Sequence, residues 1–146
     1  MNIIYTIGTS NRTIEDFGNI LLHYKIRGLI DVRRFPVSRF VHFRREHLEP
    51  FVTGKGIDYR WMGDLLGGFR AGSYEEYLAT DAFREGIAAL EQGALARTTA
   101  ICCAERLPLQ CHRKFIARHL ERRGWRVLHI LDEAHLWRQL QGELDL

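Results

Sequence analysis

The sequence predicts a single α/β domain spanning residues 1–146, with a doubly wound, mainly parallel five-stranded sheet and helices on both faces. Five short apolar runs are distributed along the chain, and helical patterns separate most of them. The length also suits one self-sufficient core, and no repeat, low-complexity tract or linker divides the chain.

Several of the predicted strands are almost continuously apolar, which is typical of a parallel sheet covered on both faces. Their alternation with helices predicts right-handed crossovers, whereas the order of the strands does not follow from the pattern. The predicted strands are residues 3–7, 29–32, 57–61, 99–103 and 127–131.

Helix boundaries are marked by capping residues. Thr13 and Asp16 form a capping-box-like start to the helix after the first strand, and Ser73 marks another start. Pro50 is expected to shorten or kink a helix over residues 44–52, and Gly124 suits the position after a helix end. Further helices are predicted over residues 81–95, 111–123 and 133–140.

The composition is that of an ordinary globular protein, with a formal net charge of +3. Of the 21 basic residues only Lys25, Lys55 and Lys114 are lysines, so arginine dominates. Guanidinium groups hold planar oxyanions in a bidentate manner, which favours an anionic ligand. The alternative is a solvated surface that carries arginine without binding anything.

The N-terminal residues lack the basic and long apolar segments of a signal peptide, and no run is long enough to cross a membrane. The three cysteines do not form an even disulfide framework. A reducing cytoplasm is therefore expected, with cysteines that are free, catalytic or metal-bound. No membrane partner and no cofactor are predicted, and the oligomeric state is not determined by these patterns.

Ligands of doubly wound sheets bind beyond the carboxyl ends of the strands, so the residues that follow each strand are the candidates for a site. Ser10 and Asn11 follow the first strand in a small polar turn, where backbone N–H groups and a hydroxyl suit an anion. An ordinary helix-capping turn is the alternative at this position.

Asp31 and Arg33 end the second strand two residues apart, so their side chains point to the same side. Asp31 is a candidate orienting group or general base, and Arg33 a candidate oxyanion ligand. An internal salt bridge at the strand end is the alternative.

The second and third strands are followed by weaker signals. The basic loop after Arg33 indicates a solvated cationic surface more than a nucleic-acid site, because no aromatic platform of clear spacing accompanies it. The basic loop after Arg33 includes Arg39, His42, Arg44, Arg45 and His47.

After the third strand, Gly67 and Gly68 allow a close backbone approach to a ligand, although a plain turn explains them equally well.

The segment 103–113 is the most informative. Strand alternation places Cys102 and Cys103 on opposite faces, and Cys103 is the better candidate because it ends the strand. Cys111 is expected at a helix N-terminus next to His112 and Arg113, where the helix dipole and the positive neighbours would lower the pKa of a thiol. A packing role for Cys111 is the alternative.

Three interpretations of this segment differ in their spacing requirements. A phosphatase or rhodanese loop needs about five residues between its cysteine and its arginine, whereas nine separate Cys103 from Arg113. Zinc sites seldom use an adjacent Cys-His pair with this gap. An anion-binding site made by the helix N-terminus, Arg113 and one thiol, with Glu105 available for proton transfer, fits best.

These motifs together resemble the domain of unknown function family 488, over nearly the whole chain. The resemblance rests on five motifs, and Thr9 stands where many members have histidine. It implies a small cytoplasmic α/β protein with a shared polar site, and it implies no reaction. The motifs are Thr6-Ile7-Gly8-Thr9-Ser10-Asn11, Asp31-Val32-Arg33, Leu66-Gly67-Gly68, Cys103-Ala104-Glu105 and Cys111-His112-Arg113.

Three functional hypotheses follow. The first is an enzyme for an anionic, phosphorylated or nucleotide-like molecule, with Arg33 and Arg113 binding the anion and Cys103 or Cys111 as a nucleophile. The second is a non-catalytic module that binds a nucleotide or nucleic acid. The third is a metal-binding or redox thiol protein that uses Cys103, Cys111 and His112.

Overall fold

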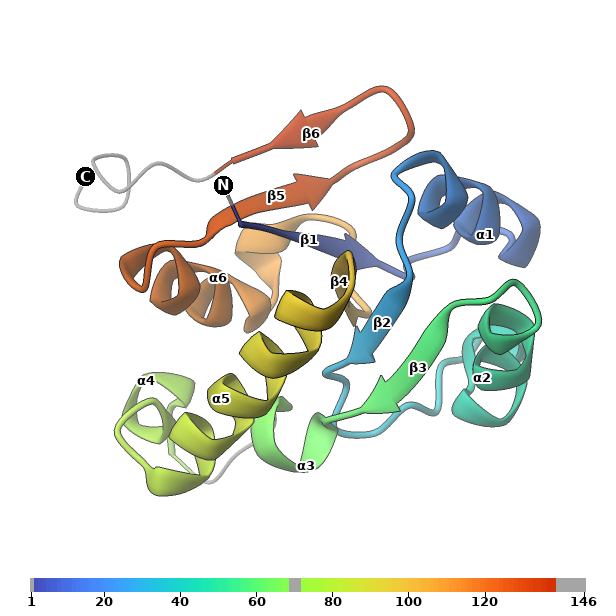
Figure 1. Ribbon diagram of the computed structural model, residues 1–146. Helices are drawn as coiled ribbons and strands as arrows, with labels where there is room; N and C mark the ends of the chain where they lie inside the picture. Colours follow the sequence, from blue (N-terminus) through green and yellow to red (C-terminus); the bar gives the residue numbers. More distant parts are fainter. Residues whose placement is uncertain (1, 69–71, 139–146) are drawn as a thin grey trace.

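The computed structural model describes residues 2–68 and 72–138, and its centre is one six-stranded sheet with strand order β3-β2-β4-β1-β5-β6 (Figure 1). Strands β1 to β5 are mutually parallel, and β6 pairs antiparallel with β5. The strands are β1 (Ile3–Gly8), β2 (Gly28–Asp31), β3 (Asp58–Trp61), β4 (Thr99–Cys103), β5 (Arg126–Ile130) and β6 (Leu136–Trp137).

The predicted α/β class and mainly parallel sheet are confirmed, and the number of strands is six instead of five. The predicted helix over residues 133–140 is wrong in its described part, because β6 lies there. Asp132 accepts hydrogen bonds from the Ala134 backbone and the His135 ring, which closes a turn that returns the chain to β5. Residues 139–140 of that prediction lie outside the described residues.

In the part of the chain that the structure describes, six α-helices and two short 3₁₀ helices connect the strands. The predicted caps are present: the Thr13 and Ser73 hydroxyls accept from the backbone N–H three residues later, and Gly124 has a φ of +97° after the end of α6. The helices are α1 (Ile14–His23), η1 (Val41–Phe43), α2 (Arg45–Thr53), α3 (Gly63–Leu66), α4 (Tyr74–Tyr77), α5 (Asp81–Ala96), η2 (Pro108–Gln110) and α6 (Arg113–Arg122).

Helices α2 and α6 differ from their predicted bounds. Helix α2 continues past Pro50 to Thr53. Helix α6 begins at Arg113, two residues later than expected, because η2 precedes it and Cys111 has an extended backbone. Cys111 therefore lies just before the helix and not in its first turn.

The helices cover both faces of the sheet (Figure 1). Apolar side chains of α1 and α2 pack on one face together with Ala100 and Cys102, and those of α5 and α6 pack on the other with Ile101 and Cys103. The expected opposite orientation of the two adjacent cysteines is thereby confirmed. Within the described ranges, no helix is long and apolar enough to span a bilayer.

Candidate functional site at the carboxyl ends of β1, β2 and β4

After the two central strands, β1 and β4, the chain turns toward opposite faces of the sheet. Strand β1 continues into α1 on one face of the sheet, whereas the neighbouring β4 leads through η2 into α6 on the other face. Such a reversal between adjacent parallel strands opens a crevice beyond their carboxyl ends, and ligands of this type of sheet bind there.

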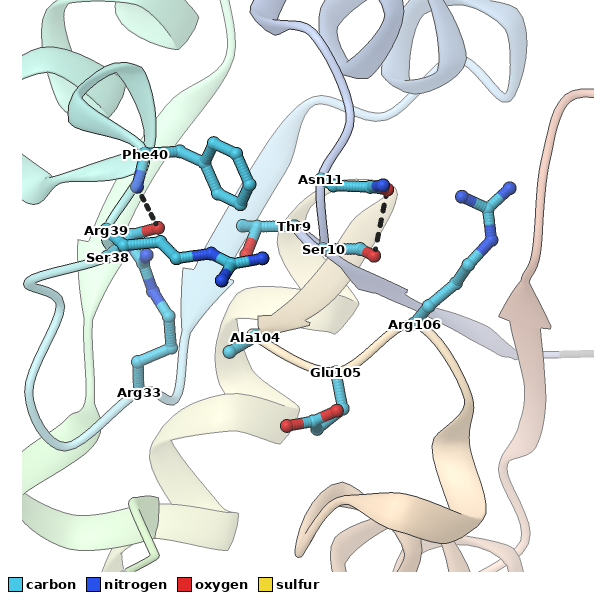
Figure 2. Close-up of a pocket in the computed structure, with 10 residues that line it drawn as sticks. All are labelled: Thr9, Ser10, Asn11, Arg33, Ser38, Arg39, Phe40, Ala104, Glu105 and Arg106. Carbon is cyan, nitrogen blue, oxygen red and sulfur yellow. Dashed lines mark hydrogen bonds between the residues drawn. The ribbon is translucent and has the colours of Figure 1, made fainter.

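A pocket of about 670 Å³ occupies this position, and we call it the switch-point pocket. Its walls come from the loops that follow β1, β2 and β4 (Figure 2). The residues that line it are Thr9, Ser10, Asn11, Arg33, Ser38, Arg39, Phe40, Ala104, Glu105 and Arg106.

The loop after β1 is fixed against the loop after β4. The backbone N–H groups of Thr9 and Ser10 donate to the carbonyls of Cys103 and Ala104, at 2.8 and 2.9 Å. Ser10 adopts a φ of +50°, which is rare for a non-glycine residue. Because its N–H group already has an acceptor, Ser10 offers the pocket its side chain.

Gly8 permits this close approach of the two loops. A Cβ atom at Gly8 would lie 1.9 Å from the carbonyl oxygen of Glu105, so a side chain cannot be accommodated without displacing the backbone. The glycine in the Thr6–Asn11 motif therefore sets the position of the wall that carries Glu105 and Arg106.

Asp31 and Arg33 form a buried bidentate ion pair at the base of the loop after β2. Arg33 donates to both carboxylate oxygens of Asp31 at 2.8 Å, and also to the carbonyl of Phe43. The Tyr59 hydroxyl donates to Asp31 at 2.5 Å. Burial opposes the charge on Arg33, but its hydrogen bonds to Asp31 and the negative charge of the acidic groups around it together outweigh this effect and raise its pKa.

Asp31 is fully buried and is occupied by these partners, so it does not line the pocket. Burial, and then the charge of Asp31, raise the pKa of Tyr59, which keeps its hydroxyl protonated as a donor. Arg33 lines the pocket, but its charge is compensated by Asp31. The structure thus shows the internal salt bridge that the sequence left as an alternative.

Two other arginines reach the pocket with exposed side chains. Arg39 comes from the loop after β2, lies 4.9 Å from the Phe40 ring centroid, and extends toward Thr9 in Figure 2. Arg106 comes from the loop after β4, and in this view its guanidinium points away from Arg39, on the far side of Ser10 and Asn11. Among the described lining residues, Glu105 carries the single carboxylate.

The other predicted residues of the segment 103–113 lie together under the loop 104–110. Arg113 is fully buried, and its Nη2 donates to the carbonyls of Glu105 and Arg106 at 2.9 and 2.8 Å. It therefore supports the pocket wall from below and does not line the pocket. The Sγ atoms of Cys103 and Cys111 are 2.7 Å apart, and His112 Nδ1 is 3.5 Å from Cys111 Sγ.

The two predicted glycines serve as packing positions away from the pocket. A Cβ at Gly67 would lie 2.6 Å from the Cβ of Arg34, and one at Gly68 would lie 3.3 Å from Nδ1 of His112. Across the part of the chain that the structure describes, no group of three or more His, Cys, Asp or Glu side chains could hold a metal ion.

Of the predicted residues, the structure brings Ser10, Asn11, Arg33 and Glu105 to the pocket and groups Cys103, Cys111, His112 and Arg113 separately. Sequence reasoning missed Ser38, Phe40 and Arg106 as lining residues and interpreted Arg39 as surface charge. The adjacent Arg39-Phe40 pair, a cation beside an aromatic ring, was the available signal.

Comparison with known proteins agrees with the motif-based expectation. The family model described as "Domain of unknown function DUF488" matches residues 13–120, which include the loop after β2 and the whole segment 103–113. Comparisons with curated proteins and with solved structures give no significant match. This chain belongs to the DUF488 family.

Proposed function

We propose that this chain binds an anionic, nucleotide-like small molecule in the switch-point pocket. The observation that carries the proposal is one pocket beyond the central strands that is lined by Arg39 and Arg106, two arginines from different loops. A guanidinium group that points into a pocket can hold a phosphate or carboxylate through paired N–H donors, and a second one at the rim adds positive charge.

The charge balance of the pocket supports an anion. Arg33 is neutralised by Asp31, which leaves Arg39 and Arg106 against Glu105. The hydroxyls of Ser10 and Ser38 and the amide of Asn11 add uncharged donors on the same walls. These groups suit the oxygens of a phosphate or a sugar.

The size and the apolar component support a molecule larger than free phosphate. A volume of about 670 Å³ lies within the range of small-molecule sites, roughly 300–1,000 Å³. The Phe40 ring offers a planar apolar surface on which a base or other aromatic group can stack. If the ligand is transformed there, Glu105 is the candidate for proton transfer, because Asp31 is engaged with Arg33 and Tyr59.

Isothermal titration calorimetry with adenosine monophosphate, adenosine and inorganic phosphate at low ionic strength tests the proposal. The monophosphate is expected to bind more tightly than either other compound. Arg39→Ala and Arg106→Ala should each weaken its binding about tenfold, since a hydrogen bond to a charged group contributes roughly 1.5–3 kcal/mol. Arg122→Ala, an exposed arginine at the far end of α6, is the matched control and should bind normally.

Equal affinity of the wild type and the Arg39→Ala variant would overturn the proposal, as would equal binding of adenosine and its monophosphate. Tighter and strongly salt-dependent binding of a mixed single-stranded oligonucleotide would instead assign the pocket to nucleic acid, the second hypothesis drawn from the sequence.

A further inference from the structure

A pair of cysteines lies beneath the loop 104–110, outside the switch-point pocket. Cys103 is the last residue of β4, and Cys111 precedes α6. Both are free thiols, and their sulfur atoms are 2.7 Å apart. A disulfide bond is about 2.05 Å long, so a small side-chain adjustment would join them.

The pair sits beside a buried positive charge. Arg113 is fully buried, and in the described part of the chain its Nε and Nη1 atoms have no hydrogen-bond partner. None of the ion pairs found among the described residues includes Arg113, and its Nη2 binds two loop carbonyls. A buried cation without a counter-charge is costly, and a thiolate next to it reduces that cost.

The two thiols differ in ways that suggest separate roles. Cys111 keeps 8% of its surface exposed, compared with 1% for Cys103. The hydrogen bond with Cys103, and then His112, lower the pKa of Cys111 against the opposing effect of burial, whereas burial raises the pKa of Cys103. A more exposed sulfur with a stabilised thiolate is the attacking member of a dithiol pair.

The third cysteine lies on the opposite face of the sheet. Cys102 packs against the α1 and α2 side, and burial raises its pKa to about 12. It is therefore expected to remain an unreactive core residue, and it offers an internal control.

We propose that Cys103 and Cys111 form a redox-active dithiol that exchanges with low-molecular-weight disulfides. The Cys111 thiolate attacks one sulfur of the small disulfide, which forms a mixed disulfide and releases one small thiolate. Cys103 then gives its proton to that thiolate, attacks Cys111 Sγ and releases the second small thiolate, which takes up from water the proton that Cys111 lost on ionising. The protein loses two hydrogens as it is oxidised to a disulfide, and the small disulfide is reduced to two thiols.

Oxidised glutathione is the probe, followed by acid quenching, denaturing alkylation and intact mass measurement. The wild type should retain one alkylatable thiol, and peptide mapping should join Cys103 to Cys111. Cys102→Ser should form the same bond. Cys103→Ser should accumulate one glutathionyl group on Cys111, because the resolving thiol is missing, and Cys111→Ser should react at least about tenfold more slowly.

Three alkylatable thiols in the treated wild type, or a disulfide that includes Cys102, would overturn the proposal. Equal reaction rates of Cys103→Ser and Cys111→Ser would also contradict it. The peptide mapping of the wild type needs no substitution, so it tests whether Cys103 bonds to Cys111 even if a variant fails to fold. The result is independent of nucleotide binding, which the calorimetry of Arg39 and Arg106 variants measures separately.

Discussion

At the scale of single residues, burial determines how much each charged side chain contributes to the stability of the fold. Asp31 and Arg33 are almost completely buried and bind each other through two hydrogen bonds, whereas Asp58 and Arg97 form one ion pair at the surface. An Asp–Arg ion pair is therefore buried in the core in the first case and exposed to solvent in the second.

Asp31→Asn is expected to lower the free energy of unfolding by about 3–5 kcal/mol, because it leaves Arg33 buried without a counter-charge. Asp58→Asn, the matched change in an exposed pair, should cost less than about 1 kcal/mol. Urea denaturation followed by circular dichroism measures both. Similar losses in the two variants would contradict the assignment of Asp31 to a buried pair.

His129 makes folding sensitive to acid. It is buried with its Nδ1 2.6 Å from the Thr6 hydroxyl, and burial, followed by the charge of Arg113, lowers its pKa to about 3. The unfolded chain binds the proton first as the pH falls. Stability from neutral His129 is thus fully present above about pH 6.5 and declines from there toward pH 3.

The wild type should therefore lose roughly 1 kcal/mol of stability per pH unit from this group over much of that range. His129→Gln, which can still bond to Thr6, should show a flatter profile between pH 6.5 and 4 when unfolding is measured in urea. Carboxylates titrate in both proteins, so the difference between the two profiles isolates His129. Parallel profiles would show that another group is responsible.

The candidate site could be predicted only in part at this scale. Polar residues directly after a strand, such as Ser10 and Glu105, are located by the strand end itself. Arg39 and Phe40 lie in a long loop whose path depends on tertiary contacts, such as the hydrogen bond from Arg33 to the carbonyl of Phe43. Whether Arg113 points to solvent or to the core likewise depends on the loop above it.

At the scale of elements, helix α5 contains two glycines in different surroundings. A Cβ at Gly93 would meet its nearest neighbour, the Ile30 side chain, at an ordinary 3.6 Å. A Cβ at the buried Gly86 would lie 2.7 Å from Leu66 and 3.0 Å from Leu65, both in α3. The second glycine lets α5 approach α3 closely.

Gly93→Ala should stabilise the protein by about 0.5–1 kcal/mol, because alanine restricts the unfolded chain and favours the helix. Gly86→Ala should destabilise it, since α3 must move away. Thermal unfolding of the two variants beside the wild type gives the comparison. A fall in the melting temperature of Gly93→Ala would contradict the prediction.

Element prediction succeeded where one physical cause dominates. Predominantly apolar runs located β1, β2, β4 and β5, whereas β3 alternates charged and aromatic residues. Capping hydroxyls located the starts of α1 and α4. The pattern failed for β6, where Leu136 and Trp137 are too few to show a period and pairing with β5 decides the conformation. It also placed the start of α6 two residues early, because a short 3₁₀ helix has no clear signature.

At the scale of the whole molecule, the strand order decides which part of the sheet is best protected. Strands β1 and β4 each have partners on both sides, whereas β3 and β6 end the order of the described strands. The backbone amides of β1 and β4 should therefore need a larger opening free energy for hydrogen exchange than those of β3 and β6.

Hydrogen exchange monitored by NMR is expected to be slowest at the amides of β1 and β4 and clearly faster at those of β3 and β6. The sequence could not supply this order, because it arises from crossovers between elements far apart in the chain. Equal protection of β3 and β1 would contradict the arrangement.

The loop 104–110 is shared by the switch-point pocket and the cysteine pair. Its first residues form a wall of the switch-point pocket, Arg113 holds them from below, and Cys103 and Cys111 flank its two ends. Thermodynamic linkage then ties the sites together: any factor by which a Cys103–Cys111 bond changes nucleotide affinity is the factor by which bound nucleotide changes the oxidation equilibrium. A reduction potential measured with and without nucleotide would thus report the coupling free energy between them.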